Sequence, residues 1–172
     1  MAETVKLVLC RGCGTRLPVV EANPDARYEA SAECFRTYGR LTVYSIAHRS
    51  PDFLHQHVVD TYGAQHVSDE APALLPAFAL IGLHLWLDRG YTGKQVKETH
   101  ARLARSRRTW PRFEVPAREW TMTMLDPLEA PEGPERDAVI EAWARSVWAV
   151  WAPRQAEIAA LVDEVLAALP SP

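Results

Sequence analysis

The 172-residue chain has few cysteines, no excess of charge and no long apolar run, and each of these shortages excludes a class of protein. Three cysteines are an odd and small number, which favours reduced thiols over a disulfide framework. The formal net charge of −3 predicts no nucleic-acid or membrane-surface partner by charge alone. With 48% hydrophobic and 24% charged residues, the composition instead indicates a globular domain with its own core.

No segment of the sequence predicts export or membrane insertion. The first residues lack the basic and apolar regions of a signal peptide, so we expect a cytoplasmic protein. The longest stretch without a formal charge, residues 71–87, has 17 residues, which is the short limit for a transmembrane helix. It also contains two prolines and a histidine, so we interpret it as a buried core helix.

The spacing of apolar residues predicts a mainly α fold, a single-domain helical bundle with a short N-terminal β-hairpin formed by residues 5–9 and 17–20. We divide residues 1–172 into four parts. These are a knuckle hairpin and loop (1–30), a helical region (31–110), a proline-rich wrap over the core (111–134) and the C-terminal helices (135–168).

Capping residues predict where the helices begin and end. Ser31 caps a helix that runs to about His48. The Ser-Pro-Asp sequence at 50–52 starts a second helix, which reaches about Tyr62 and which Gly63 ends. Further helices are expected from about 71 to 90, from 92 to 108 and from 135 onwards, with a kink or a new start at Pro153.

The three cysteines form a candidate metal site. Cys10 and Cys13 belong to a Cys-Arg-Gly-Cys-Gly knuckle, in which two thiolates can hold one ion and the glycines allow a tight turn. Cys34 follows in the first turn of the predicted helix, where the helix dipole favours a thiolate. Three sulfurs and one imidazole suit tetrahedral Zn²⁺, so zinc is the cofactor that we expect. Redox-active thiols and uninvolved cysteines are the alternatives.

The fourth ligand would come from one of six histidines. On a continuous helix, His48 lies about 21 Å from Cys34, which is too far for a shared ion. His84 lies on the most apolar predicted helix, where a core histidine is expected. His100 shares a helix face with apolar residues but lies among basic ones, so we expect a solvated or stacking side chain.

His66 and His57 are then the two candidates for the fourth ligand. They are nine residues apart, on opposite faces of a continuous helix. We choose His66, because a helix end at Gly63 would leave it free to turn toward the knuckle, and keep His57 as the alternative ligand. On a helical turn the Asp60 carboxylate can hold the His57 imidazole, as metal sites often require.

Four motifs occur in a fixed order along the chain. They are the CxxCG knuckle, the cysteine that opens the next helix, the run from His57 to His66, and the WARSVWAVWAP element at 143–153. Together they resemble a bacterial family of small proteins known only as a domain of unknown function. The resemblance spans nearly the whole chain and implies a cytoplasmic, mostly helical, metal-binding protein, with no activity to carry over.

The chain departs from this family pattern in two places. Family members often have a histidine where this chain has Ala79, and a His-His pair where it has Arg154 and Gln155. If those histidines line a second, catalytic metal centre in relatives, this chain has lost it. The resemblance therefore leaves open whether the protein is an enzyme.

Two functions follow from these motifs. In the first, a structural Cys₃His site clamps the hairpin onto the helices of a binding or regulatory module, whose partner is a small molecule or another protein. In the second, the protein is a hydrolase-like metalloenzyme in which a metal with an open position activates water. The residues that would face its cleft are His57, Asp60, Tyr62 and His66, and the first three are the catalytic candidates.

A third possibility, nucleic-acid binding, would use a basic segment. Its residues are Arg102, Arg105, Arg107, Arg108 and Arg112, with Trp110 among them. Because such charge runs are usually solvated faces, we expect no nucleic-acid partner and no membrane partner.

Overall fold

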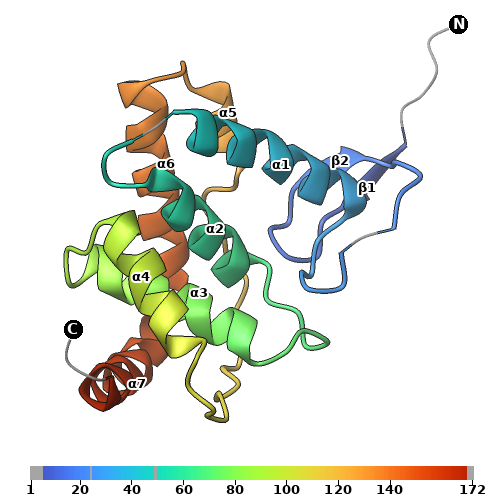
Figure 1. Cartoon of the computed structure of the whole chain (residues 1–172). Helices are drawn as coiled ribbons and strands as arrows, with labels where there is room; N and C mark the ends of the chain where they lie inside the picture. The colour runs from blue at the N-terminus through green and yellow to red at the C-terminus, as the bar shows by residue number, and fades with distance from the viewer. Residues whose placement is uncertain (1–5, 24, 49, 170–172) are drawn as a thin grey trace, which may run out of the picture.

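The computed structural model describes residues 6–23, 25–48 and 50–169, and within them a two-stranded hairpin precedes seven α-helices (Figure 1). The elements in chain order are β1 (Leu7–Leu9), β2 (Arg16–Pro18), α1 (Ala32–Ala47), α2 (Leu54–Gln65), α3 (Leu74–Leu87), α4 (Gly93–Leu103), α5 (Leu125–Glu129), α6 (Pro134–Val150), the 3₁₀ turn η1 (Ala152–Arg154) and α7 (Gln155–Ala168). The mainly α fold with a short N-terminal hairpin is thereby confirmed.

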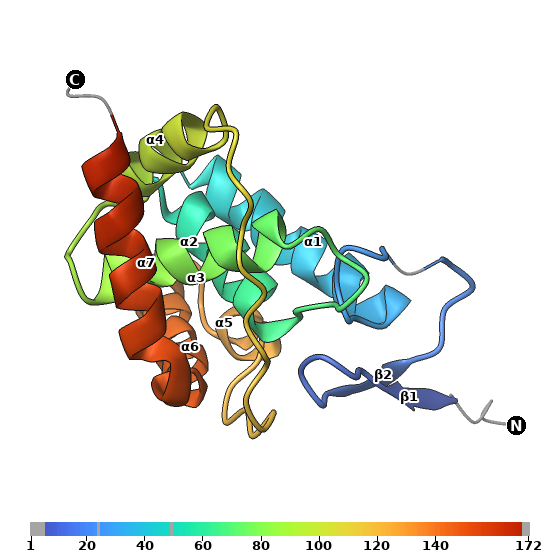
Figure 2. The same ribbon diagram turned by 90° about the horizontal axis from the view of Figure 1, so that it is seen from below.

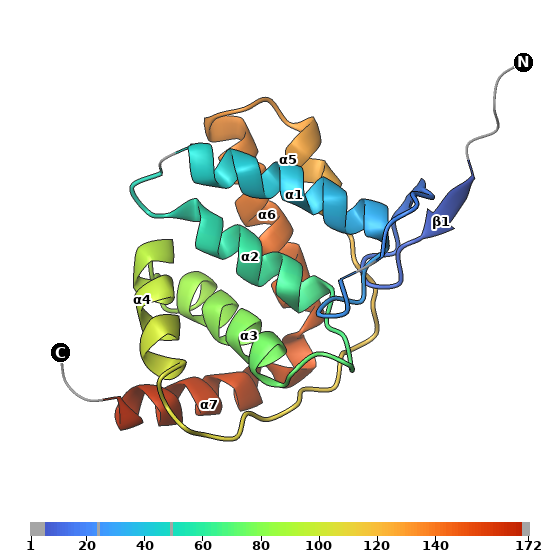
Figure 3. The same cartoon turned by 45° about the vertical axis from the view of Figure 1, so that its right-hand side comes forward.

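Helix α2 is the centre of the arrangement. It packs against α1, α3, α4 and α6, and Figure 3 shows α1, α2 and α3 side by side with α6 crossing behind them. Helix α3 carries no charged residue and buries most of its side chains, as expected for the apolar segment. Among the described helices, none combines the length and the apolar character needed for a membrane span.

The hairpin lies at one end of the helical layer, beside the start of α1 (Figure 2). Its strands are antiparallel and pair Val8 with Leu17. Of the predicted arms, 5–9 and 17–20, Val5 lies outside the described residues, and the second strand begins one residue earlier and ends two residues earlier than predicted. Leu17 is buried, whereas Leu7 and Leu9 are about half exposed. Two strands of three residues bury too little apolar surface to be stable alone, so the hairpin depends on its attachment to the helices.

Helix α1 begins as predicted, because the Ser31 hydroxyl accepts a hydrogen bond from the backbone N–H of Cys34 (3.3 Å). The predicted start of α2 at residues 50–52 is wrong. These residues form a turn in which Ser50 accepts from the N–H of Asp52, and α2 begins after Phe53, whose backbone is left-handed (φ 56°). The turn docks against the start of α4, where Lys94 N–H donates to the Asp52 carbonyl (3.2 Å).

The predicted end of α2 at Gly63 is also wrong, since the helix continues to Gln65, with His66 as its C-cap. Gly63 allows close packing of two helices and does not end α2. A Cβ atom there would lie 3.1 Å from the Cβ of Ala79, so the missing side chain lets α2 and α3 approach closely. Tertiary contact therefore overrides the tendency of glycine to end a helix.

The chain between α4 and α5 crosses the helical layer to reach the hairpin (Figure 2). It is ordered by side chains that enter the core, since Phe113 and Met124 are buried. The indole N–H of Trp120 donates to the Gly12 carbonyl in the knuckle (2.6 Å). The segment 111–134 also contains the short helix α5, which the sequence did not predict.

Candidate metal centre

Cys10, Cys13, Cys34 and His66 meet where the hairpin touches α1 and α2, and their ligand atoms all lie within 4.8 Å of one another. The Sγ atoms of Cys13 and Cys34 are 3.9 Å apart, and the Cys34 Sγ lies 3.3 Å from His66 Nε2. Ligands of a tetrahedral zinc, with bonds of about 2.3 Å to sulfur and 2.0 Å to nitrogen, are about 3.5–3.8 Å apart. The spacing of the four side chains therefore fits one tetrahedral ion.

The knuckle is shaped by a tight turn. Gly14 N–H donates to the Cys10 carbonyl and Cys10 N–H donates to the Thr15 carbonyl, both at 2.8 Å. Gly14 has a left-handed backbone (φ 76°), which glycine adopts without strain. A Cβ on Gly12 would collide with the Glu29 carbonyl and the His66 ring. Both glycines of the motif are thus needed for the cysteines to approach the histidine.

The two helices deliver the other two side chains from their ends. Cys34 lies in the first turn of α1, and His66 lies at the residue that ends α2. His66 Nδ1 lies 3.0 Å from the Tyr62 carbonyl, which can only accept, so Nδ1 carries the proton and Nε2 presents a lone pair to Cys34. This is the orientation that a metal-binding imidazole takes when a carbonyl holds its other nitrogen.

A stack of aromatic rings fixes this histidine. The Tyr62 ring stacks on His66 with centroids 3.9 Å apart, and Tyr38 stacks on the other side of Tyr62 at 3.8 Å. The Tyr62 hydroxyl lies 3.5 Å from the Cys34 Sγ. Burial, together with the neighbouring Cys34, raises the pKa of Tyr62, so its hydroxyl keeps its proton and can donate to the sulfur.

The electrostatics of the four side chains favour a bound cation. Cys10, Cys34 and His66 are fully buried and Cys13 is nearly so. Hydrogen bonds with Cys13 and Cys34 lower the pKa of Cys10, whereas hydrogen bonds with Cys10 and Cys13, together with burial, raise the pKa of Cys34. Burial lowers the pKa of His66, but contacts with Cys10 and Cys13 outweigh it and leave the pKa raised. A divalent cation would let all three buried sulfurs be thiolates at once.

The three cysteines are free thiols. The distance of 3.9 Å between the sulfurs of Cys13 and Cys34 is well beyond the length of a disulfide, about 2.05 Å. His48, which the sequence excludes as a ligand, lies far along α1 and pairs with Asp137 (2.8 Å).

The residues of the metalloenzyme hypothesis do not line one cleft in the described part of the chain. Tyr62 and His66 are fully buried at the cysteines. His57 stacks on Trp86 at 3.8 Å and borders one hollow of the surface, whereas Asp60 lines a different cavity. Burial lowers the pKa of His57 to about 3, so this imidazole is neutral.

The predicted pairing of His57 with Asp60 is wrong. Asp60 Oδ1 accepts from the Gln56 amide (3.0 Å), while Asp60 Oδ2 and His57 Nδ1 have no hydrogen-bond partner. The His57 ring stacks on Trp86 instead.

Two further side chains belong to the polar interior, Gln56 and His100, and the sequence gives no signal for Gln56. Of the two alternatives for His100, solvated or stacking, the stacking one is found: the ring stacks on Phe78 with centroids 4.8 Å apart and is buried. The signal for its burial was present, because His100 shares a helix face with Val96 and Leu103, both of which are buried.

The basic segment is partly engaged within the fold. Arg108 pairs with Glu164 (2.8 Å), and Arg112 donates to the carbonyls of Asp69 and Ala71. In these contacts the two guanidinium groups bind protein oxygens, and nucleic-acid phosphates would have to compete for them. The absence of a nucleic-acid partner stays a prediction.

Comparison with known proteins identifies a family but no activity. Neither the curated proteins nor the solved structures contain a match to the chain. A family of unknown function, DUF5946, matches residues 8–152, a range that includes all four side chains of the cluster. Because the match covers most of the sequence, the chain belongs to the DUF5946 family.

Proposed function

We propose that the protein is a zinc-binding module in which Cys10, Cys13, Cys34 and His66 hold one structural Zn²⁺. The observation that carries the proposal is the convergence of four buried ligand atoms, all within 4.8 Å of one another, from three separate parts of the chain. The ion would join the hairpin to α1 and α2, so the hairpin and the helices would form one domain.

The chemistry of the ligands favours zinc. Thiolate sulfur and imidazole nitrogen are the donors of tetrahedral structural zinc sites, and Cys₃His is one of the standard combinations. The group contains no carboxylate, which Mg²⁺ or Ca²⁺ would require. The site needs reduced cysteines, and a reducing compartment such as the cytoplasm supplies them.

A structural role is favoured over a catalytic one for this ion. Four protein ligands complete a tetrahedron, whereas catalytic zinc keeps one position for water or substrate. Cys34 and His66 have no exposed surface, and the Tyr62 ring covers the imidazole. The module would therefore use its metal for shape and bind its partner elsewhere.

X-ray absorption spectroscopy at the zinc edge of the purified protein tests the ligand set. We expect three sulfur neighbours at about 2.3 Å and one nitrogen neighbour at about 2.0 Å. A matched pair of variants assigns the nitrogen, since His66→Ala should release the zinc, whereas His57→Ala should keep the zinc together with its nitrogen neighbour. A first shell with two or fewer sulfurs, or with oxygen as its main neighbour, would contradict the proposal.

A further inference from the structure

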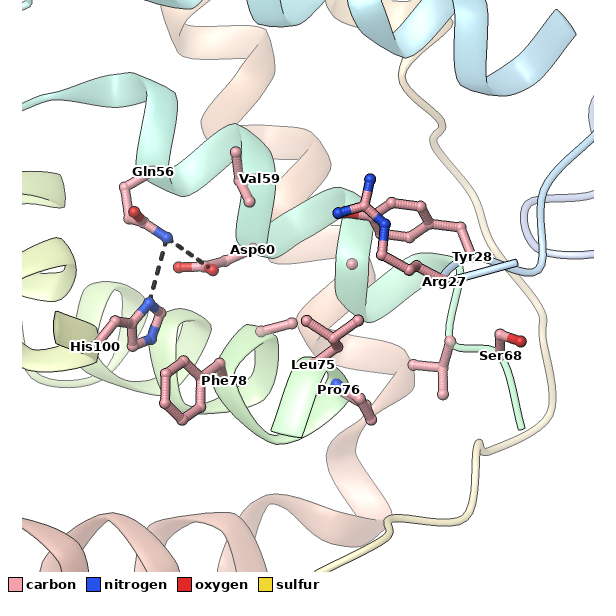
Figure 4. A pocket seen from close by; sticks show the side chains of 13 residues that line it. Arg27, Tyr28, Gln56, Val59, Asp60, Ser68, Leu75, Pro76, Phe78 and His100 are labelled. Carbon is pink, nitrogen blue, oxygen red and sulfur yellow. Dashed lines mark hydrogen bonds between the residues drawn. The ribbon is translucent and has the colours of Figure 1, made fainter. Parts of the chain in front are cut away.

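A second polar cluster lies away from the cysteines, at a cavity of about 180 Å³ between α2, α3 and α4 (Figure 4). Asp60, Gln56 and His100 line it on one side, and Leu75 and Phe78 of α3 form an apolar wall. The loop before α1 also borders the cavity through Arg27 and Tyr28. The cavity is thus mainly apolar, with one group of polar side chains.

Gln56 arranges the polar side of this cavity. Its amide nitrogen lies 3.0 Å from Asp60 Oδ1 and 3.3 Å from His100 Nδ1, as the dashed lines in Figure 4 show. An amide NH₂ group has two hydrogens and can donate to both neighbours. His100 Nδ1 is then an acceptor, so the proton of the neutral ring is on Nε2.

Two polar atoms of this group have no hydrogen-bond partner, namely Asp60 Oδ2 and His100 Nε2. Only 4% of Asp60 and 9% of His100 is exposed, so solvent satisfies neither side chain well. Buried polar atoms without a partner are few in native proteins. Asp60 lines the cavity and its Oδ1 accepts one hydrogen bond, from Gln56, so the carboxylate can accept a further hydrogen bond from a ligand.

The fold makes room for the Asp60 carboxylate. A Cβ atom at Gly82 of α3 would collide with its Oδ2, so the absence of a side chain at Gly82 is what admits the acid between the helices. An acid that only filled space could be replaced by an apolar side chain with a gain in stability. Helices α2 and α3 thus enclose a carboxylate whose Oδ2 forms no hydrogen bond within the described part of the protein.

No cation of the described residues neutralises Asp60. The Arg27 guanidinium borders the same cavity, but it forms three hydrogen bonds of 2.6–3.1 Å with Asp25. Burial raises the pKa of Asp60 well above its usual value and lowers the pKa of His100 to about 4, so His100 offers no positive charge to an Asp60 carboxylate near pH 7. The cavity therefore favours a ligand that brings its own positive charge.

We propose that this cavity binds a small molecule made of one flat apolar ring and a short cationic nitrogen group, such as an amidinium, that donates to the Asp60 carboxylate. The size follows from the volume, because a cavity of about 150 Å³ binds benzene. The ring would lie against Phe78 and Leu75, which line the cavity. This inference concerns a different site from the proposed zinc centre and does not depend on it.

Isothermal titration calorimetry with three matched probes tests the proposal. Benzamidine carries the charge, benzamide is a neutral molecule of nearly the same shape, and benzoate is an anion. We expect benzamidine to bind at least tenfold more tightly than benzamide, and benzoate not to bind. Equal affinities for benzamidine and benzamide, or no binding of benzamidine, would overturn the proposal.

Variants of the chain locate the site. Asp60→Asn should weaken benzamidine binding at least tenfold and change benzamide binding less than threefold. Glu98→Gln, which removes an exposed carboxylate of α4 outside this cavity, should leave both affinities unchanged. A loss of benzamidine binding in Glu98→Gln would mean general charge attraction and would overturn the proposal.

A space-filling variant provides a test that does not alter the acid. Val59 lines the cavity from α2 and is only half-buried, so Val59→Phe can add bulk at the wall while the helix stays folded. A cooperative thermal unfolding transition and a metal content equal to that of the wild type would show that each variant is folded. Benzamidine binding that persists in a folded Val59→Phe protein would contradict the assignment to this cavity.

Discussion

The two polar clusters of this protein lie along the same helix, α2, and differ in how their atoms are paired. At the C-terminal end, His66 is bonded through Nδ1 and meets Cys34 through Nε2, so the four ligand side chains face one another. Near the N-terminal end, Gln56 joins Asp60 to His100 but leaves Asp60 Oδ2 and His100 Nε2 without a partner. A closed group suits an ion that stays bound, and an open group suits a ligand that exchanges.

The two clusters also differ in what they contribute to the stability of the fold. The cysteine and histidine group joins elements that have little other contact, since the hairpin touches the helices mainly at α1. The Asp60 cavity lies inside helices that already pack on one another. Disrupting the first group should therefore unfold part of the molecule, whereas altering the second should change binding with little loss of stability.

The largest effect is expected from Cys34→Ser. Loss of one thiolate from the proposed Cys₃His shell removes the zinc, and loss of a structural metal costs about 4 kcal/mol or more of unfolding free energy. Denaturant unfolding together with metal analysis checks this. Ser45→Ala, a buried change on the same helix that removes hydrogen bonds to Thr42 and His55, should keep the zinc. Unchanged zinc content in Cys34→Ser would remove Cys34 from the shell.

The next largest loss of stability is expected from His66→Ala, and His57→Ala is its control. His66→Ala should release the zinc and lower the free energy of unfolding by about 3 kcal/mol, because it leaves buried thiolates uncompensated. His57→Ala should keep the zinc and lose only the stacking contact with Trp86. Metal content and thermal unfolding of the two variants provide the measurement. If zinc is lost from His57→Ala and kept in His66→Ala, the two roles are reversed.

Asp60→Asn is expected to raise the free energy of unfolding, whereas the variants above lower it. Because burial raises the pKa of Asp60 in the folded state, the folded protein holds this proton more tightly than the unfolded chain does. The wild type therefore loses stability as the pH rises above about 4, and the variant lacks this loss. At pH 7 the variant should be more stable by about 1 kcal/mol or more, with the difference disappearing near pH 4.

Denaturant unfolding of both proteins between pH 4 and pH 8 measures that difference, and any change in metal binding with pH affects both alike. A variant that is less stable than the wild type at pH 7 would mean that Asp60 is a structural acid. The contrast between the two clusters would then fail.

The smallest loss of stability is expected from a change in the proline-rich segment 111–134, which contains Trp120. Trp120→Phe removes the indole N–H that donates to the Gly12 carbonyl, and a hydrogen bond of this kind contributes about 1 kcal/mol. Amide hydrogen exchange of the knuckle should become faster while the zinc stays bound. Trp110→Phe changes a half-buried tryptophan that packs against Phe78 at the other cluster, and it should leave exchange in the knuckle unaltered. Equal effects of the two variants would contradict a specific contact.

Much of the candidate metal site could be predicted from the sequence, because its signals are local. The knuckle spacing and the helix cap at Ser31 place three cysteines at chain positions where thiolates are favoured. The convergence of His66 with them was predicted for a wrong reason, since α2 does not break at Gly63. The helix simply ends one residue before His66, and its last turn already faces the knuckle.

The cavity could not be predicted, because it is made by packing between distant segments. Gln56 and His100 are 44 residues apart and meet only when α2 lies beside α4. The sequence leaves a solvated and a stacking side chain open for His100, and the apolar face of α4 buries it in a stack on Phe78. The helix start at 50–52 failed for a related reason, because the turn docks on α4 and α2 begins later.

The central claim is that the Cys₃His group holds a structural zinc ion, and metal analysis of the protein, purified without added metal, tests it most directly. The account predicts about one zinc per chain, and chelation of this zinc should loosen the hairpin and lower the thermal stability. A metal-free sample that is fully folded, with an ordered hairpin and unchanged stability, would contradict the account.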